Sequence, residues 1–520
     1  MGDRVPGDPG RDVDVLIVGA GPTGLLAACE LLRQGVRVRI VDQNERPATV
    51  PKALSLWPRV RDILTDLGVG EEVERASLPI RAFRYLSDRR PVASLTFTDD
   101  LAARQLPQYE TERILTERLH SLGGKVERGV RLLCLDDVDF SDRIESTSPV
   151  TAVLEHGDGL VEHFAAPFVI GADGAGSAVR RQLGIGFEGS TYELAFALLD
   201  THIEGHLPAD EISYYQSTSG TLVVVPQREG VFRFLTVMPQ STTMSRGAMQ
   251  RLIDTRGPRG VRITEPVWET VFRVHARRAT EFRRGRVFLA GDSAHVHSPA
   301  GGQGMNNGLQ DAHNLAWKLA AVIQGRSPVG LLSTYSPERV EATSRIVRDT
   351  DIHTRALTAR TPRRVALRDR TFQFLDRTGA AARLYAPVMA GRRLAYSPQR
   401  ATQRPTGGPC LLPGTARPGA VLPRPAALDL GLAGPDAGVP GWTLLLRAPT
   451  GDSRWAAEAR RAAVRWPQLR VRHLGRTRGL CARPGYHLIR PDAHIAAHGH
   501  PGDLSRLTAE LDAFLVPDAL

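Results

Sequence analysis

The sequence predicts an α/β protein with a parallel sheet and helices first, an antiparallel sheet in the middle and a small α/β unit at the end. Residues 13–42 follow a strand, a glycine turn, a helix and a second strand. Residues 187–282 alternate apolar and polar side chains, as in ALLDTHI and VFRFLTVMP, and a Pro/Gly-rich stretch near 400–425 precedes new strands and helices. A chain of 520 residues suggests two to three domains. We expect the chain to divide at 12–185, 186–285, 286–395 and 405–520.

The first motif is the glycine turn GAGPTG at residues 19–24. A strand over 13–18 precedes it, a helix to about Gln34 follows, and a second strand over 36–41 ends at an acidic residue. This is the βαβ fingerprint of dinucleotide binding, although it does not distinguish FAD from NAD. Its glycines allow the tight turn, the approach of a pyrophosphate and close packing of helix on strand, and the acid can bind ribose hydroxyls. The candidate residues are Gly19, Gly21, Pro22, Thr23, Gly24, Asp42 and Gln43.

A second glycine-rich segment lies at residues 286–320. A buried strand over 287–290 is predicted to end at Gly291, and a loop with three further glycines leads into a helix with apolar residues at helical spacing. Such a loop lets the backbone approach a flat ligand, and the new helix offers free N–H groups to negative charge. The candidate residues are Asp292, Pro299, Gly302, Gly304, Met305 and Asn306.

A third motif, GADGAGSAVR, spans residues 171–180. The pattern predicts a strand over 168–170, a turn and a short helix from Ser177, with Asp173 capping the helix and Arg180 bracing the turn. Elsewhere, Lys52 precedes a helix, and Gln108 opens another.

Composition limits the classes of function. The net charge is +11, but only three of the 67 basic residues are lysines and the arginines are spread along the chain, which is typical of a GC-rich genome rather than of nucleic-acid binding. No apolar run approaches the roughly 20 residues of a membrane span, and the N-terminus does not resemble a signal peptide. The four cysteines form no C-x-x-C pair, so we expect free thiols, no metal site and a cytoplasmic protein.

The three motifs, in this order, resemble those of the FAD-dependent aromatic hydroxylases typified by p-hydroxybenzoate hydroxylase. The resemblance covers roughly residues 12–345. The segment LIRPDAHIAAH at 488–498 is similar to the C-terminal thioredoxin-like domain of polyketide-tailoring members, which hydroxylate polycyclic phenols. The resemblance therefore implies an FAD-binding Rossmann-like domain with an inserted antiparallel-sheet substrate domain, followed by a thioredoxin-like α/β domain.

The resemblance also implies roles for single residues. The first-motif glycines and Asp42 would hold the ADP half of FAD, and Gln108 and Asp292 would bind its ribityl and pyrophosphate region. Pro299 would lie by the reactive face of the flavin, and the N–H groups of 304–306 would meet its pyrimidine edge. Asp173 belongs to a motif tied to both FAD and NADPH, and Arg233 falls where the family has an arginine near the isoalloxazine. Arg233 and Pro299 are therefore the catalytic candidates.

Two positions depart from the family pattern. Lys52 stands where arginine is frequent, so the charge is kept but the planar fork is lost. Leu235 stands where p-hydroxybenzoate hydroxylase has a tyrosine for the substrate carboxylate, which argues against a small benzoate. We expect the apolar strands at 222–225 and 232–237 to wall a larger ring system, with Tyr214 or Arg233 as groups that could polarise a phenol.

The expected activity is hydroxylation of a polycyclic, polyketide-type phenol through a flavin hydroperoxide, as in antibiotic biosynthesis. FAD would be the resident cofactor, dioxygen a substrate and NADPH (or NADH) a transient reductant, because the chain has one dinucleotide fingerprint. The protein would be a monomer or homodimer without nucleic-acid or membrane partners. Two alternatives remain open at this point: a Baeyer–Villiger monooxygenase on the same scaffold, and a non-catalytic FAD protein that binds aromatic ligands.

Overall fold

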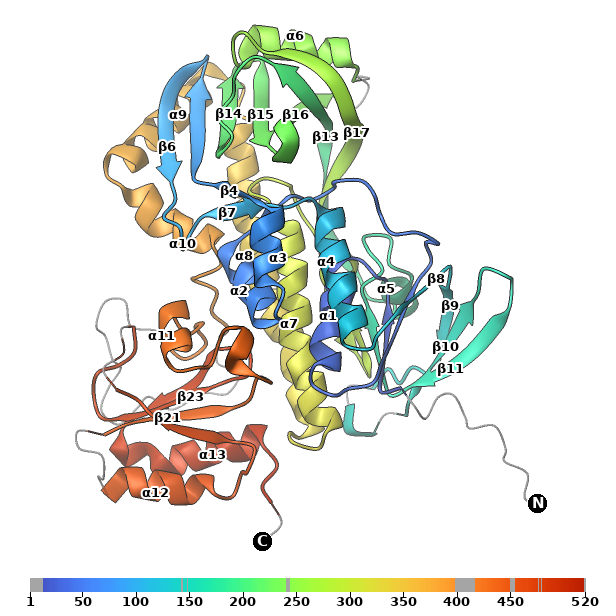
Figure 1. The fold of residues 1–520 in the computed structure, drawn as a ribbon, viewed down its shortest axis with the longest axis vertical. Coiled ribbons are helices and arrows are strands. Elements are labelled where there is room, and N and C mark those ends of the chain that lie inside the picture. Colours follow the sequence, from blue (N-terminus) through green and yellow to red (C-terminus); the bar gives the residue numbers. More distant parts are fainter. Residues whose placement is uncertain are drawn as a thin grey trace.

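A computed structural model describes residues 13–141, 144–146, 148–239, 244–397, 417–448, 454–475, 477 and 479–518. Figure 1 shows three regions: a sheet region with β13–β17 at the top, a central group of helices around α7, and a C-terminal unit containing β21 and β23 at the lower left. The N-terminal tail, most of the Pro/Gly-rich stretch near 400–425 and Cys410 lie outside the described residues.

The first region is built on a six-stranded sheet in the order β18-β19-β12-β1-β2-β8. β1 pairs in parallel with both β2 and β12, and β19 joins β12 from far along the chain, also in parallel. The central strands β1, β12 and β19 are short apolar runs because both faces of such a sheet are covered. Their bounds are β1 Val15–Val18, β2 Val38–Asp42, β8 Val126–Arg128, β12 Phe168–Gly171, β18 Arg283–Arg284 and β19 Val287–Leu289.

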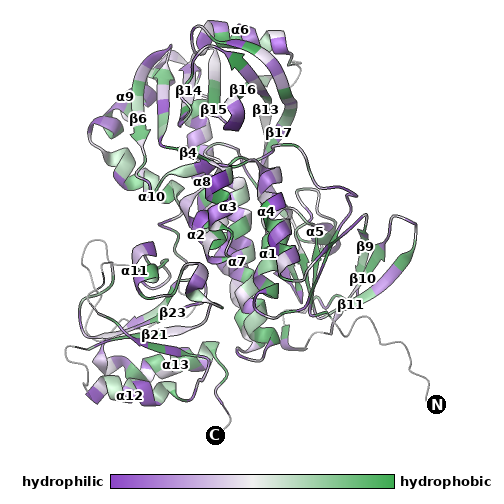
Figure 2. Cartoon of the chain, viewed as in Figure 1, coloured by the Kyte–Doolittle hydropathy of each residue, from purple (hydrophilic) through white to green (hydrophobic). Residues whose placement is uncertain are grey.

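Helices α1 (Pro22–Leu32), α4 (Gln108–Ser121) and α7 (Gly304–Ile323) accompany this sheet, and α1 packs against both α4 and α7. Figure 2 shows apolar colouring on α1 and on the lower part of α7, in agreement with the buried leucines and alanines of both helices. The long helix α8 (Tyr335–Leu357) also contacts α7. Around them lie α2 (Pro58–Asp66), α3 (Gly70–Ala76) and α5 (Ala178–Gln182).

The middle region is an eight-stranded sheet in the order β20-β17-β13-β16-β15-β14-β5-β6. The period-two pattern correctly predicted the long antiparallel strands β13 (Phe187–Glu204) and β17 (Arg262–Ala279), with β14 (Glu211–Ser217), β15 (Gly220–Pro226) and β16 (Val231–Pro239). It did not predict that β5 (Ala82–Ser87) and β6 (Arg90–Thr96) extend this sheet, with β5 parallel to β14. Helix α6 (Arg246–Arg256) contacts this sheet at β14, β15 and β17, and α9 (Pro362–Arg377) lies beside β6 (Figure 1).

Two small sheets complete these regions. One has the order β11-β10-β9 and the other β3-β7-β4. Their bounds are β9 Arg131–Asp136, β10 Val150–Glu155, β11 Val161–Ala166, β3 Ser55–Leu56, β4 Leu78–Ile80 and β7 Ala103–Gln105; the short β20 spans His295–Val296 and α10 spans Ala386–Met389.

The C-terminal unit is a four-stranded mixed sheet in the order β22-β21-β23-β24, with α11, α12 and α13. β21 pairs in parallel with β22 and antiparallel with β23. Leu444 and Leu446 pack with Trp466 and Leu511 between the sheet and its helices. The bounds are β21 Thr443–Arg447, β22 Arg470–His473, β23 Gly485–Ile489, β24 Ile495–Gly499, α11 Arg424–Asp429, α12 Arg454–Ala463 and α13 Leu504–Phe514.

The cysteines require one correction. Cys29 and Cys134 are free, as expected. The expectation is wrong for Cys481, which is disulfide-bonded. The spacing of cysteines along the chain could not show this, because a disulfide needs only that the folded chain bring two thiols together.

Candidate active site

A cavity of about 650 Å³ lies where the glycine loops of the first region face the eight-stranded sheet. One wall comes from the loop after β1, the segment 52–55, and the loop that leads into α7; the opposite wall comes from β13–β17. Several chain segments far apart in sequence therefore enclose one space, and most of the side chains facing it from the sheet are apolar.

The structure brings many of the predicted residues to this cavity and leaves others outside it. The cavity is lined by Gly21, Pro22, Thr23, Lys52, Gln108, Arg233, Asp292, Pro299, Gly302, Gly304 and Met305. The predicted residues that do not line it are Gly19, Gly24, Asp42, Gln43, Asp173 and Asn306.

The glycines of the first motif explain this division. A Cβ on Gly24 would lie 2.0 Å from the carbonyl oxygen of Gly19, and a Cβ on Gly19 would lie 2.4 Å from that of Ala172. These two glycines therefore serve close packing of the backbone. Gly21 differs, because nothing lies within 4 Å of its Cβ position. Its open side faces the cavity, where a ligand could approach the backbone.

Asp42 and Asp173 organise backbone at the edge of the site. Asp42 accepts hydrogen bonds from the N–H groups of Ala20 at 2.7 Å and Asn44 at 2.8 Å, which holds the glycine turn against the end of β2. The N-cap of α5 is Ser177 rather than Asp173. Asp173 instead accepts from the Ser177 hydroxyl at 2.5 Å and from the N–H of Val179 at 3.1 Å.

Arg180 braces the same turn, as predicted. It donates to the carbonyl of Ala175 at 2.8 Å and to that of Ser293 at 2.7 Å. The third motif is thereby tied to the segment after β19.

The first and second motifs meet at Thr23. A Cβ on Gly291 would lie 2.6 Å from the Thr23 hydroxyl, and a Cβ on Gly308 would lie 2.5 Å from it. Only glycine at both positions lets the first turn pack against the strand end and against α7.

The loop into α7 is shaped by Gly301 and Gly302, which have φ of 79° and 64°. Asn306 is 1% exposed, and its side chain holds this loop through hydrogen bonds. Its amide N–H groups donate to the carbonyls of Ser55 at 2.7 Å and Gly302 at 2.8 Å. Its side-chain oxygen accepts from the N–H of Trp57 at 2.8 Å. Asn306 therefore shapes the site through its side chain from outside the cavity.

Most N–H groups of the Arg233 guanidinium are hydrogen-bonded to other protein groups. Its Nε and Nη2 donate to Asp200 at 2.8 Å each, its Nη1 donates to the carbonyl of Lys52 at 2.8 Å, and its Nη2 also donates to the carbonyl of Pro51. Four of the five N–H bonds of a guanidinium are thus used. Arg233 holds the 51–52 segment on the sheet, so that Lys52 and the residues after it stay at the cavity.

The side chain of Asp292 is exposed, and it lines the cavity. Desolvation by the protein around the cavity raises the pKa of its carboxyl, an effect that nearby His295 and Lys52 oppose. His297 also lines the cavity. Burial, followed by the neighbouring His295, lowers the pKa of His297 to about 4, so the ring is neutral near pH 7.

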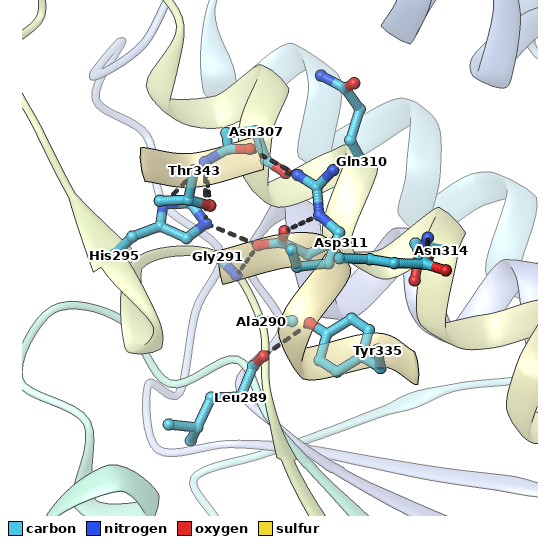
Figure 3. A network of polar contacts seen from close by, with 12 residues as sticks. Leu289, Ala290, Gly291, His295, Asn307, Gln310, Asp311, Asn314, Tyr335 and Thr343 are labelled. Atoms are coloured by element: carbon cyan, nitrogen blue, oxygen red, sulfur yellow. Dashed lines mark hydrogen bonds and ion pairs between the residues drawn. The ribbon is translucent and has the colours of Figure 1, made fainter. Parts of the chain in front are cut away.

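A buried polar network lies behind this motif (Figure 3). Asp311 on α7 accepts from the N–H of Gly291 at 2.9 Å, lies 2.7 Å from Nε2 of His295, and accepts from Nε of Arg339 at 2.6 Å. All three side chains are fully buried. Burial acts to raise the pKa of Asp311, but Arg339 and His295 outweigh it, and the pKa is lowered. An ionised carboxylate therefore fixes the end of β19.

The sheet side of the cavity contains residues that sequence reasoning identified only in part. Val223, Val225, Leu235 and Val237 line it, while the alternate residues of β15 and β16 face α6. Side chains from more distant segments could not be assigned from local pattern: Phe83 on β5, Phe196 and Leu198 on β13, Trp268, Thr270 and Phe272 on β17, and Thr354, Leu357 and Thr358 at the end of α8. Only the period-two alternation of β13 and β17 gave a signal.

Tyr214 lines the same wall and is 4% exposed. It stacks on Tyr85 with ring centroids 4.8 Å apart and meets Phe83 edge-on at 5.7 Å. Within the described residues its hydroxyl has no hydrogen-bond partner. Burial raises the pKa of this hydroxyl, so it stays protonated.

These features fit FAD. Nothing lies within 4 Å of a Cβ position on Gly21 or on Gly304 at the N-terminus of α7. Both glycines line the cavity, so a ligand has room beside the backbone N–H groups at both places. The Asp292 carboxylate, which lines the same cavity, can accept hydrogen bonds from ligand hydroxyls.

Comparison with known proteins agrees with this geometry. A family model described as "FAD binding domain" matches residues 12–350. The chain is 33% identical to 6-methylpretetramide 4-monooxygenase from Streptomyces rimosus, over 97% of this chain and 94% of the other. Its structure is similar to that of the OxyS anhydrotetracycline hydroxylase from Streptomyces rimosus, with a TM-score of 0.76 and 26% identity, covering 97% of this chain and 99% of that one.

It is also similar to the flavin-dependent monooxygenase PieE, solved in complex with FAD and substrate, with a TM-score of 0.75 and 25% identity over 96% of this chain and 98% of that one. A family match over more than half of the chain and a relative aligned along nearly its whole length agree with the three motifs and the cavity they line. This chain belongs to the family of FAD-dependent aromatic monooxygenases of the p-hydroxybenzoate hydroxylase type, in its polyketide-tailoring branch.

Proposed function

We propose that this enzyme hydroxylates a polycyclic, polyketide-type phenol with FAD, NAD(P)H and dioxygen. The observation that carries the proposal is the single cavity, which joins the glycine-lined FAD wall to a broad apolar sheet wall. The relatives named for pretetramide and anhydrotetracycline substrates support the substrate class. Leu235, in place of a carboxylate-binding tyrosine, faces this cavity and offers nothing to a benzoate carboxylate.

FAD, when bound, supplies the activation of dioxygen and the transfer of one oxygen atom to the ring. Gly21, Thr23, Asp292 and the N-terminus of α7 would hold it, with Pro299 at the flavin face that the substrate approaches. Arg233 would act by holding the 51–52 segment in place rather than by touching the substrate. The apolar strands would orient the ring system and exclude water, which limits unproductive loss of the oxidising equivalent.

Tyr214 would bind the substrate oxygen. Its hydroxyl is protonated, has no hydrogen-bond partner among the described residues and belongs to the apolar wall, so it can donate a hydrogen bond that stabilises a phenolate. A phenolate is richer in electrons than a phenol at its ortho and para carbons, which favours attack by an electrophilic oxygen.

NAD(P)H would bind transiently, because one dinucleotide fingerprint is found and it lies at the FAD wall. Loop 301–304, with two residues at positive φ, would allow the flavin to move toward it. The C-terminal unit, with its mixed sheet and flanking helices, would be a thioredoxin-like domain without dithiol activity, since the sequence has no C-x-x-C. A cytoplasmic location and the choice between monomer and homodimer stay predictions, as do the four domain boundaries.

None of the helices in the described segments is both long and apolar enough to cross a membrane.

The test offers polycyclic phenols and p-hydroxybenzoate with NADPH and ¹⁸O-labelled dioxygen, followed by mass spectrometry. One labelled oxygen should enter a polycyclic ring as a hydroxyl group. A lactone would indicate Baeyer–Villiger chemistry instead, and efficient turnover of p-hydroxybenzoate would contradict the proposed substrate class.

A further inference from the structure

The turn between β23 and β24 inserts into the FAD-binding region. Its residues 490–494 belong to the segment LIRPDAHIAAH, and Ala493 has a φ of 61°, which is rare for a residue with a Cβ. Asp492 is 1% exposed and His494 2%. The carbonyl of Asp492 accepts a hydrogen bond from Arg59 of α2 at 2.8 Å. The turn is therefore buried against helices that belong to another part of the chain.

The turn makes an ion cluster with α7 and α8. Arg490 donates to the two oxygens of Glu338 at 2.6 and 3.0 Å, and to Asp492 at 2.6 Å. Glu338 also accepts from Lys318 and Asn314 of α7 at 2.8 Å each. Burial acts to raise the pKa of Glu338, but Arg490 and Lys318 lower it to about 2. Without Arg490, Glu338 would keep Lys318 and Asn314 as partners, but Asp492 would lose its only arginine partner within the described residues and keep His494.

Arg339 follows Glu338 on α8 and extends these contacts toward the cavity. Arg339 donates to Asp311 at 2.6 Å, to the side chain of Asn307 at 2.6 Å and to the Tyr396 hydroxyl at 3.1 Å. The ring of Tyr396 lies 5.4 Å from the Arg490 guanidinium and stacks on His494 at 4.4 Å. Arg339 is thus held both through the helix backbone next to Glu338 and through Tyr396.

The last contact reaches the glycine-lined wall of the cavity. The second oxygen of Asp311 accepts the N–H of Gly291 and lies beside His295 (Figure 3). Asp292 and His295 line the cavity. A continuous set of buried contacts therefore runs from the C-terminal unit to the backbone that carries Asp292.

We propose that Arg490 is a positioning residue for FAD: through Glu338, Arg339 and Asp311, the β23–β24 turn holds the 291–295 segment in its binding geometry. The members are buried, so water cannot replace a lost partner, and removing one charge leaves another uncompensated. The C-terminal unit thereby contributes to cofactor affinity without touching the cavity. This inference rests on FAD binding and is independent of the substrate proposed above.

The test uses the full-length protein stripped of FAD. In Arg490→Met, amide hydrogen exchange in a peptide covering 287–298 should accelerate, and the Kd for FAD, measured by quenching of flavin fluorescence, should rise about tenfold. Arg490→Lys keeps the charge and should restore part of the affinity. Tyr396→Phe should weaken FAD binding less, and its effect should be smaller in the Arg490→Met background than alone.

Two controls separate positioning from general destabilisation. Arg454→Met changes an exposed arginine of α12 in the same unit and should leave both the exchange and the Kd unchanged. Leu511→Ala disrupts the core of the C-terminal unit at a residue that is not a member of the ion cluster. If Leu511→Ala raises the Kd as much as Arg490→Met at matched stability, or if Arg490→Met leaves the exchange at 287–298 unchanged, the proposal is wrong. Loss of product with normal FAD binding would count against the proposed function alone.

Discussion

At the scale of single residues, the protein around the cavity determines which hydrogen-bond partners a side chain has and therefore what it can bind. Tyr214 is packed by Tyr85 and Phe83, and its hydroxyl has no protein partner within the described residues. Asp292 is held at the cavity by backbone whose N–H is bound to Asp311. In both cases the surroundings, rather than the residue type, determine what the side chain can do.

Replacing Tyr214 by phenylalanine should lower the rate of hydroxylation about tenfold, because one hydrogen bond to a developing charge is lost. FAD affinity should not change, because the ring still fills its place. Slower hydroxylation should lower the coupling, which is the amount of product formed per NADPH consumed and can be measured with a polycyclic phenol. Equal coupling in the variant and the parent would remove Tyr214 from the proposed mechanism.

Replacing Asp292 by alanine should weaken FAD retention without unfolding the protein. The carboxylate is exposed and lines the cavity, so its loss should remove a contact to the ligand rather than one within the protein. The flavin absorbance that remains after gel filtration would measure retention, and circular dichroism would check the fold. Full retention of flavin would contradict the assignment.

At the scale of elements, the six-residue glycine turn between β1 and α1 contains glycines of two kinds: some allow close packing of the backbone, and one leaves room for a ligand. Gly24 and Gly19 contact protein backbone, whereas Gly21 faces open space. The two kinds of glycine should therefore respond differently to the same substitution.

Gly21→Ala should lower FAD affinity while leaving the apoprotein as stable as the parent, because the added methyl group meets no protein atom. Gly24→Ala should reduce the stability of the apoprotein itself, since its Cβ would lie 2.0 Å from a carbonyl oxygen. Thermal unfolding of both apoproteins, together with FAD titration, compares them directly. Equal stability of the two apoproteins would show that the turn tolerates both changes.

Sequence reasoning succeeded where a local pattern carries the information. The βαβ fingerprint and the strand–loop–helix at 286–320 were confirmed as β1-α1-β2 and β19-α7, and the long strands followed from their alternation. It could not find partners from distant segments: β5 beside β14, Phe83 in the cavity, or Asp311 bound to Gly291. It also could not show that four N–H bonds of Arg233 are already used. Such facts depend on tertiary contacts, which leave no periodic trace in the chain.

At the scale of the whole molecule, several buried histidines are kept neutral. Burial lowers the pKa of His353 to about 4 and that of His487, which also lies near His498 and Arg447, to about 3. His297 behaves in the same way. The unfolded chain, with histidine pKa values near 6.5, binds more protons below that pH than the folded chain does.

Stability should therefore fall as the pH drops from about 6.5 towards 4, by up to about 1.4 kcal/mol per pH unit for each such histidine. Carboxylates with lowered pKa values, such as Glu338, add to the loss only below about 4.5. Thermal unfolding between pH 7 and pH 5 isolates the histidine effect. His353→Gln and His487→Gln should each flatten the slope, and an unchanged slope in both would refute the explanation.

The strand order of the six-stranded sheet also sets a sequence of events during synthesis. β19 pairs with β12, but the residues between them form most of the eight-stranded sheet. A ribosome must therefore complete β13–β17 before β19 and α7 emerge. The glycine-lined wall of the cavity needs β19 and α7, so we expect FAD to be captured only after the residues of β13–β17 have been synthesised. Truncated translation products that stop earlier should therefore leave the ribosome without flavin.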